Sequence, residues 1–259
     1  MKRTLVLFAA LFLSVLMADA KTVRKAFDLD GFTGIRASDA FEIVVEKSND
    51  FLVEVEVTEE FLPFLQVKNR GGMLELSFSR LPFSLRQKER KREAQVLVRM
   101  PELSGIILSG GCSFSSNDEF ALAMNKFTID LKGGSSISNL NVKAPDVDVK
   151  LSGASRAVLN IRTSDMDAQL SGASRMEVTG RASDFRVKAE GASRVLASEF
   201  ETDEAVAKAS GASALEIRPL NLLRVELSGA SKCRYYGDEE GLSVKAEKVS
   251  GASSLKHGD

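Results

Sequence analysis

Apolar and polar residues alternate along most of the chain with a period of two. At residues 127–131, 147–151 and 223–227, for example, every second position is apolar. That period is typical of β-strands with one buried face, whereas an amphipathic α-helix repeats its apolar positions every three to four residues. The pattern therefore predicts an all-β protein.

A second periodicity lies on top of the first, because the phrase Ser152-Gly153-Ala154-Ser155-Arg156 keeps returning. Related phrases stand at residues 109–112, 132–135, 171–175, 190–194, 210–214, 228–232 and 250–254, about twenty residues apart. A unit of this length holds two or three short strands and cannot bury its apolar face without stacking on its neighbours. We therefore expect residues 109–254 to form a right-handed parallel β-helix, a solenoid of about eight coils of ~20 residues. Leucine-rich repeats, calcium-binding nonapeptide repeats and β-propellers are disfavoured, because the sequence lacks their ladder residues or unit lengths.

The position of a residue relative to the first glycine of each phrase predicts which way its side chain faces. Apolar residues stand two, four and six positions before that glycine and four positions after it, and we expect them to face inward. The positions expected to face outward stack into three ladders. These are the acids Asp146, Asp165, Asp184 and Glu204, the serines Ser155, Ser174, Ser193, Ser213, Ser231 and Ser253, and the cations Arg156, Arg175, Arg194 and Lys232.

The cation ladder is the candidate ligand-binding feature. Arginines about 4.8 Å apart repel one another unless they splay or find counter-ions. Arg156, Arg175, Arg194 and Lys232 are therefore candidates for a strip that contacts an anion or a glycan. The alternative is a row of solvated corner residues that acidic neighbours such as Glu177 and Glu190 compensate, which is the commoner fate of surface charges.

Residues 21–108 predict a β-rich N-terminal region ahead of the coils. Residues 41–46 and 52–57 alternate as strands, and the turn cluster Ser48-Asn49-Asp50 between them predicts a hairpin. Residues 67–76 are typical of two strands joined by a tight turn at a glycine pair.

Two further segments complete this region. Pro63 limits residues 61–65 to a short turn or helical step, and residues 94–101 return to a strand pattern. The run at residues 86–92, RQKERKR, is expected to be a solvated basic loop, and the other interpretation is a patch for anionic glycans or lipid headgroups.

The first twenty residues have the pattern of a secretory signal peptide. Lys2 and Arg3 precede the apolar run from Leu5 to Met17, and a small-x-small site predicts cleavage between Ala20 and Lys21. A membrane anchor is the alternative, but the run is short for a span. We expect an exported chain in the periplasm, at the cell surface or outside the cell, with residues 21–259 as a single domain and no transmembrane segment in the mature protein.

Composition narrows the function. The formal net charge of −1 argues against nucleic acid as a partner, because phosphates favour a basic excess. The only histidine, His257, stands near the end of the sequence, which disfavours Ser-His and His-metal chemistry. Carboxylate pairs such as Asp165 and Asp167 suit glycoside hydrolysis, but they recur as part of the repeat. We predict no enzyme, no cofactor and no metal site, since Ca²⁺ at the acid ladder would want further oxygen partners.

The two cysteines are expected to be free thiols. Cys112 and Cys233 accompany phrases six coils apart, so at about 4.8 Å per coil they lie roughly 29 Å from each other. An exported protein permits a disulfide, but this distance forbids one between them. Counting from the glycine predicts that Cys112 faces outward and Cys233 inward.

The segments at residues 32–35, 41–45 and 74–76, together with the serial Ser-Gly-Ala-Ser phrases, resemble the head GIN domain family. Members of that family are described as putative auto-transporter adhesins and are common among exported proteins of Bacteroidetes. The resemblance, over residues 27–254, implies a β-helical exported protein of the cell envelope that adheres to a surface glycan or an envelope protein. The alternative is a periplasmic structural or sensory accessory protein without an extracellular ligand, and a carbohydrate-active enzyme is a third, weaker hypothesis.

Overall fold

The structure, a computed structural model, describes residues 21–87, 93–238 and 241–258. The predicted signal peptide, its cleavage position at Ala20 and most of the basic run lie outside these ranges. The described elements are β1 (Thr22–Phe27), β2 (Gly34–Ala37), β3 (Glu42–Lys47), β4 (Leu52–Thr58), the 3-10 helix η1 (Glu59–Phe64), β5 (Leu65–Arg70), β6 (Met73–Phe78), the single helical turn α1 (Phe83–Arg86), β7 (Ala94–Met100), β8 (Gly105–Leu108), β9 (Ser113–Ala121), β10 (Phe127–Leu131), β11 (Ser136–Lys143), β12 (Asp146–Leu151), β13 (Arg156–Arg162), β14 (Asp165–Leu170), β15 (Arg175–Ala189), β16 (Arg194–Ala209), β17 (Ala214–Leu227), β18 (Lys232–Tyr235), β19 (Ser243–Val249) and β20 (Ser254–His257).

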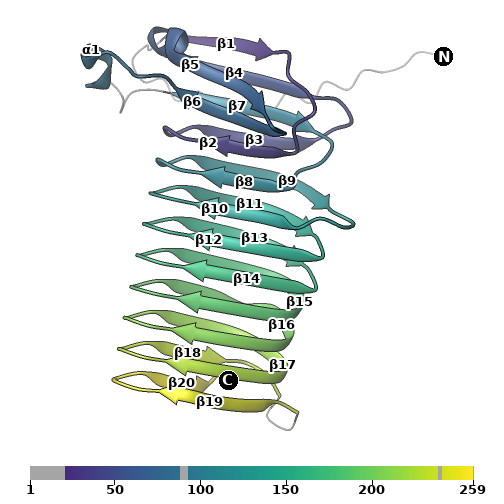
Figure 1. Cartoon of the computed structure of the whole chain (residues 1–259), viewed down its shortest axis with the longest axis vertical. Helices are drawn as coiled ribbons and strands as arrows, with labels where there is room; N and C mark the ends of the chain where they lie inside the picture. The colour runs from purple at the N-terminus through teal and green to yellow at the C-terminus, as the bar shows by residue number, and fades with distance from the viewer. Residues whose placement is uncertain (1–20, 88–92, 239–240, 259) are drawn as a thin grey trace, which may run out of the picture.

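The strands wind into a flattened β-solenoid of about eight turns (Figure 1). Each coil contributes one strand to each of two facing sheets, so the unit holds two strands. In one sheet β8, β10, β12 and β14 pair in parallel, and in the other β9, β11 and β13 do the same. In the later coils β15, β16 and β17 are single long strands that run through both sheets. The predicted parallel β-helix is confirmed.

The interior follows the predicted alternation. Leu151, Leu170 and Leu227 stand two positions before the glycine, and Met176 and Val195 stand four positions after one; all are 0–2% exposed. Phe185 and Phe200, from neighbouring coils, meet edge to face at 5.3 Å between ring centroids. A single buried cluster runs from Phe32 to Cys233, so the coils share one core.

The solenoid begins earlier in the chain than the repeats suggest. β2 and β3 form the first coil, and β8 and β9 stack on one side of it in parallel register. On its other side lie β6 and β7, also parallel. The chain therefore adds strands above its first coil before it returns below that coil to build the repeats.

The predicted hairpin of residues 41–46 and 52–57 is wrong. β3 and β4 do not pair with each other, because β7 lies between them, parallel to β3 and antiparallel to β4. Alternation predicts which face of a strand is buried but not which strand lies next to it. The turn at residues 48–50 leads to β4, which lies one strand beyond β7. By contrast, β5 and β6 form the expected antiparallel pair across Gly71-Gly72, and η1 is the expected short helical step around Pro63.

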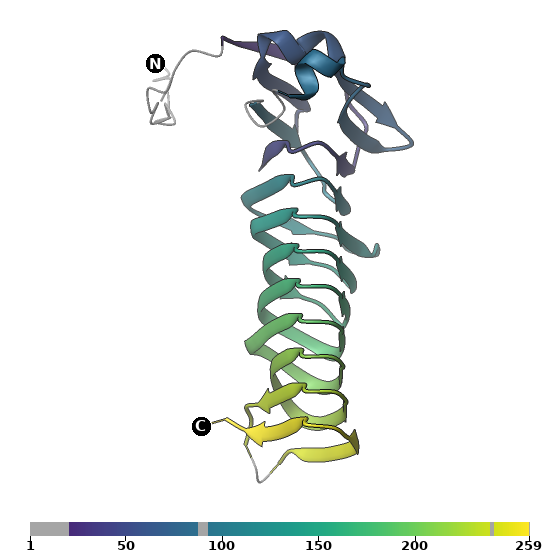
Figure 2. The same ribbon diagram turned by 90° about the vertical axis from the view of Figure 1, so that its left-hand side faces the viewer.

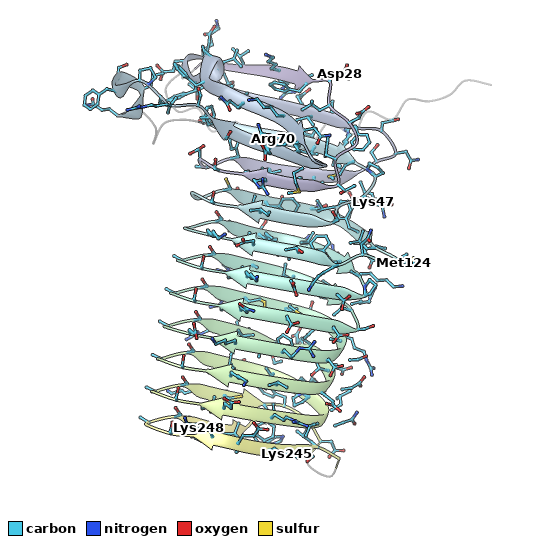
Figure 3. The ribbon with its side chains drawn as sticks, viewed as in Figure 1. Asp28, Lys47, Arg70, Met124, Lys245 and Lys248 are labelled. Carbon is cyan, nitrogen blue, oxygen red and sulfur yellow. The ribbon has the colours of Figure 1, made fainter. Side chains whose placement is uncertain are left out.

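The two ends of the solenoid differ (Figure 2). At the N-terminal end, β1, β4 and the β5–β6 hairpin pair antiparallel above the first coil, and Phe61 of η1 is fully buried there. At the C-terminal end, β19 and β20 each pair with only one described strand, and Val249 is 44% exposed. Lys245 and Lys248 mark that end in Figure 3, while Met124, 91% exposed, projects from the lateral edge opposite the glycine phrases.

Candidate functional site

The repeated phrase forms a column of tight corners along one edge of the solenoid, at the left of Figure 1 and toward the viewer in Figure 2. Gly153, Gly172 and Gly191 adopt φ of +76° to +77°, a conformation that L side chains rarely take. The following alanine donates its backbone N–H to the glycine carbonyl of the preceding coil at 2.7 Å, as Ala192 does to Gly172. A Cβ on Gly191 would lie 2.6 Å from that carbonyl oxygen. Both backbone constraints fix where the next strand begins.

Five of the six serines predicted to face outward face inward, which corrects the prediction; Ser213 and Ser231 are 0–1% exposed, whereas Ser253 is half-buried. Ser155, Ser174 and Ser193 are 1% exposed, and each hydroxyl donates to the carbonyl oxygen three residues earlier at 2.8 Å. The outward prediction was wrong because the backbone at the left-handed glycine is not extended, so the alternation of inward and outward side chains does not continue through the corner. A buried hydroxyl is tolerated there because its hydrogen bond closes the turn.

Cys112, predicted to face outward, occupies the same inward position in an earlier corner. Its side chain is 0% exposed and its Sγ lies 3.2 Å from the carbonyl oxygen of Ser109. Cys233 faces inward as predicted and is 2% exposed. Both are free thiols, and burial raises the pKa of Cys112 and raises that of Cys233 to about 12. Neither group is poised as a nucleophile.

The cation ladder stacks in the register that the sequence predicts. Arg156 pairs with Arg175, and Arg175 pairs with Arg194, on adjacent parallel strands. We call these three residues the arginine strip. The same column continues with Ser136 before the strip, and with Ala214, Lys232 and Ser254 after it. The backbones of the three arginines thus follow one another at the spacing of the strands, about 4.8 Å.

Carboxylates compensate the arginine strip only weakly. Arg175 reaches Glu177 at 3.9 Å, at the limit of an ion pair, and its shielded Nε has no hydrogen-bond partner. Within the part of the chain that the structure describes, neither Arg156, Arg194 nor Lys232 forms an ion pair. Glu190, expected to compensate the strip, instead pairs with Lys188 at 2.7 Å.

Three other arginines of this sheet pair with carboxylates. Arg162, Arg181 and Arg218 continue along the same sheet and contact carboxylates at 3.0–3.7 Å; their partners are Glu119, Asp203 and Glu201. Arg156 and Arg194 therefore differ from these three arginines in pairing, not in residue type.

The acid ladder is also in register, and an arginine pairs with part of it. Asp146, Asp165, Asp184 and Glu204 align on successive strands. Arg186 donates to both Asp165 and Asp167 at 3.0 Å, and these contacts raise the pKa of its guanidinium. Among the described residues no group of three or more ligand-type side chains is placed to hold a metal ion. Among the described residues, Asp165 is the one ladder acid that forms an ion pair.

Aromatic side chains on the lateral faces are all buried. Between residues 105 and 227 the aromatic residues are Phe114, Phe120, Phe127, Phe185 and Phe200, and each is at most 1% exposed. Among the described residues, partly exposed aromatic rings lie toward the two ends, at residues such as Phe27, Phe51 and Tyr235. The lateral faces thus offer charge and hydrogen bonds to a ligand but no ring to stack on.

These features define a parallel β-solenoid whose lateral face carries a row of weakly compensated cations. In the described part of the chain no helix is long and apolar enough to cross a membrane. The chain belongs to the family described as "Putative auto-transporter adhesin, head GIN domain", which matches residues 31–238. No curated protein sequence matches it.

Solved structures share the fold. A putative adhesin from Parabacteroides distasonis superposes with a TM-score of 0.79 at 17% identity, covering 92% of this chain and 98% of the other. A putative adhesin from Parabacteroides merdae gives a TM-score of 0.73 at 17% identity, with 92% and 97% covered. A putative lipid binding protein from P. distasonis gives 0.76 at 15% identity, with the same coverage. At these identities the likeness shows a common fold and nothing finer.

Proposed function

We propose that this chain is an exported, non-enzymatic, adhesin-like module that binds an anionic glycan through the arginine strip. The observation that carries the proposal is the lack of counter-ions: Arg156 and Arg194 have no carboxylate partner among the described residues, and Arg175 has one at 3.9 Å. Stacked cations without partners favour a ligand that brings carboxylate or sulfate groups at matching intervals.

The lateral face narrows the class of glycan. Neutral sugars are commonly held by stacking on exposed aromatic rings, and the solenoid buries every aromatic ring between residues 105 and 227. A ligand of the arginine strip must therefore be recognised through its charge. Membership of an adhesin family supports a binding role, and the signal-like first twenty residues support export to the periplasm or the surface.

Binding of polysaccharides to two triple variants tests the proposal. Arg156→Ser/Arg175→Ser/Arg194→Ser removes the strip, and serine already occupies the same column at Ser136 and Ser254, so the fold should tolerate it. The control, Arg162→Ser/Arg181→Ser/Arg218→Ser, removes the same charge from paired positions on the same sheet. Sulfated and uronic-acid polysaccharides are compared with neutral ones at several salt concentrations.

We expect the first variant to lose binding of anionic polysaccharides at least tenfold, and the control to lose much less. Affinity of the unmodified protein should fall as salt rises, because exposed charges are screened. Equal losses of affinity in the two variants would mean that the arginine strip acts only as part of the general surface charge. Unchanged binding in both would refute the proposal.

Location and catalysis need separate tests. Protease treatment of intact cells and of spheroplasts distinguishes a surface adhesin from a periplasmic structural or sensory protein, since only a surface chain is degraded in intact cells. Incubation with a panel of polysaccharides should release no reducing ends, and turnover of any of them would overturn the non-enzymatic assignment.

A further inference from the structure

An open depression lies at the N-terminal end of the molecule, in the region that Asp28 marks in Figure 3. Its volume is about 570 Å³, and two segments line it: residues 26–30 at the end of β1 and residues 49–52 at the start of β4. This volume is within the range of small-ligand sites. The depression belongs to the antiparallel strands above the first coil, whereas the arginine strip lies on β13, β15 and β16.

Aromatic rings form part of its wall and are held in place. Phe51 packs edge to face on the fully buried Phe32, at 4.9 Å between ring centroids. Phe27 is half-buried, and the Nζ of Lys25 lies 5.0 Å from the centre of its ring. Lys25 therefore already makes a cation–π contact with the Phe27 ring, and a ligand cation would take its place there.

The loops that carry these rings are tied to their surroundings. Asn69 donates its side-chain N–H to the backbone carbonyl of Asp30 at 2.6 Å, and Asp50 donates its backbone N–H to the Ser48 hydroxyl at 3.2 Å. Leu29 donates its backbone N–H to the carbonyl of Phe27 at 3.1 Å. The wall is therefore built before a ligand arrives, which lowers the entropic cost of binding.

The charged residues that line the depression are all negative, while the Nζ of Lys25 lies beside it over the Phe27 ring. Asp28, Asp30 and Asp50 line it together with Asn49, and no lysine or arginine does. None of the three carboxylates forms an ion pair with a described residue, although nearby Glu56 is held by Arg24 at 2.8 Å. Their oxygens are not grouped to hold a bare metal ion in the described structure.

We propose that this depression binds a protonated primary amine carried on a small ring, with an amino sugar as the fitting chemical class. The ammonium group is attracted by the carboxylates and, where it takes the place of the Lys25 Nζ, by the face of Phe27. The hydroxyl groups of the ring donate to carboxylate oxygens and exchange hydrogen bonds with Asn49. The site is independent of the arginine strip and opposite to it in sign, so a glycan that carries both charges has two distinct places to contact.

Titrations followed by amide NMR test this site, with glucosamine, N-acetylglucosamine and glucose as probes. We expect glucosamine to shift the amides of residues 26–30 and 49–52 and to bind at least fivefold more tightly than the two uncharged sugars. The double variant Asp28→Asn/Asp50→Asn should weaken glucosamine roughly five- to tenfold, because each carboxylate contributes a modest attraction at an exposed site. Raised salt should weaken it in the unmodified protein.

The matched control is Asp146→Asn/Asp184→Asn, which removes two acids from the lateral face and should leave glucosamine binding unchanged. The variant that removes the arginine strip should also leave it unchanged, so this test is separate from that of the proposed function. Equal affinity for glucosamine and glucose would overturn the proposal. Equal losses in the two aspartate variants, or amide shifts confined to other segments, would overturn it as well.

Discussion

Replacing Gly191 by alanine should destabilise the protein more than an ordinary glycine substitution at a left-handed position. Gly191 has φ of +77°, and a Cβ there would lie 2.6 Å from the carbonyl oxygen of Gly172. Gly72, in the β5–β6 turn, has nearly the same φ of +78°, but a Cβ on it would have no heavy atom within 4 Å. Comparing the two separates the conformational cost from the steric one.

The expected magnitudes follow from these contacts. A left-handed conformation costs an L residue about 1–2 kcal/mol, and this term is common to both variants. The overlap at Gly191 is with backbone, and the oxygen concerned accepts the N–H of Ala192 at 2.7 Å. Relief of the overlap stretches that hydrogen bond or shifts the coil, for about 1–3 kcal/mol more. We therefore expect about 2–5 kcal/mol for Gly191→Ala and about 1–2 kcal/mol for Gly72→Ala.

Urea unfolding followed by far-UV circular dichroism measures the difference. Because solenoids do not always unfold in one step, hydrogen exchange at the Ala192 amide serves as the local measurement. That amide should lose protection in Gly191→Ala and keep it in Gly72→Ala. A Gly191→Ala variant within about 0.5 kcal/mol of Gly72→Ala, a difference at the level of ordinary surface changes, would refute the close-approach argument.

Three further predictions concern the buried corner and the thiols. Ser193→Cys should destabilise the protein less than Ser193→Val, because Cys112 fills the same position in another corner, whereas valine leaves a buried carbonyl oxygen without its hydrogen-bond donor. Thermal melts compare the two variants, and a valine variant as stable as the cysteine variant would contradict this. Neither cysteine should react with a thiol reagent in the folded protein at pH 8, because burial raises the pKa of both thiols, and both should react in denaturant. The raised pKa of Cys233, about 12, means that the unfolded state loses its thiol proton first as the pH rises. The free energy of unfolding should therefore fall by up to about 1.4 kcal/mol per pH unit from about pH 9 toward pH 12. The variant Cys233→Val should show a shallower decline; valine already occupies this column at Val195.

Local alternation and the spacing of the glycines were enough to predict the solenoid. Each coil repeats the same inward positions, so aligning the phrases aligns the strands, and Arg156, Arg175 and Arg194 fell into register as expected. The direction of the serines was not predictable by counting, since a left-handed glycine changes the phase of the alternation at the corner. The order of the first strands could not be predicted either, because no residue pattern in β3 or β4 indicates that β7 lies between them.

Two further features could not be predicted because they depend on which side chains and segments meet in the folded chain. The pairing of Glu190 with Lys188, and not with a strip arginine, follows from side-chain reach on neighbouring strands. The depression at the N-terminal end joins residues 26–30 with residues 49–52 through the antiparallel pairing of β1 and β4. The hairpin of β3 and β4 that the sequence pattern predicts does not place these two segments side by side, so the depression could not be predicted from it.

The rigid corner also links the stability of the free protein to its proposed binding. The corner fixes the start of each strand, so the three arginines cannot increase the separation of their backbones and relieve their repulsion only by splaying. Two unit charges at about 4.8 Å in water repel by roughly 1 kcal/mol. Arg175, between the other two, bears this repulsion twice and has a single carboxylate contact at 3.9 Å in return. A change of Arg175 to serine should therefore leave the free protein as stable as before or slightly more stable at low salt, while it weakens an anionic ligand. Loss of both stability and binding in that variant would instead mean that Arg175 is held by the fold and does not serve the ligand.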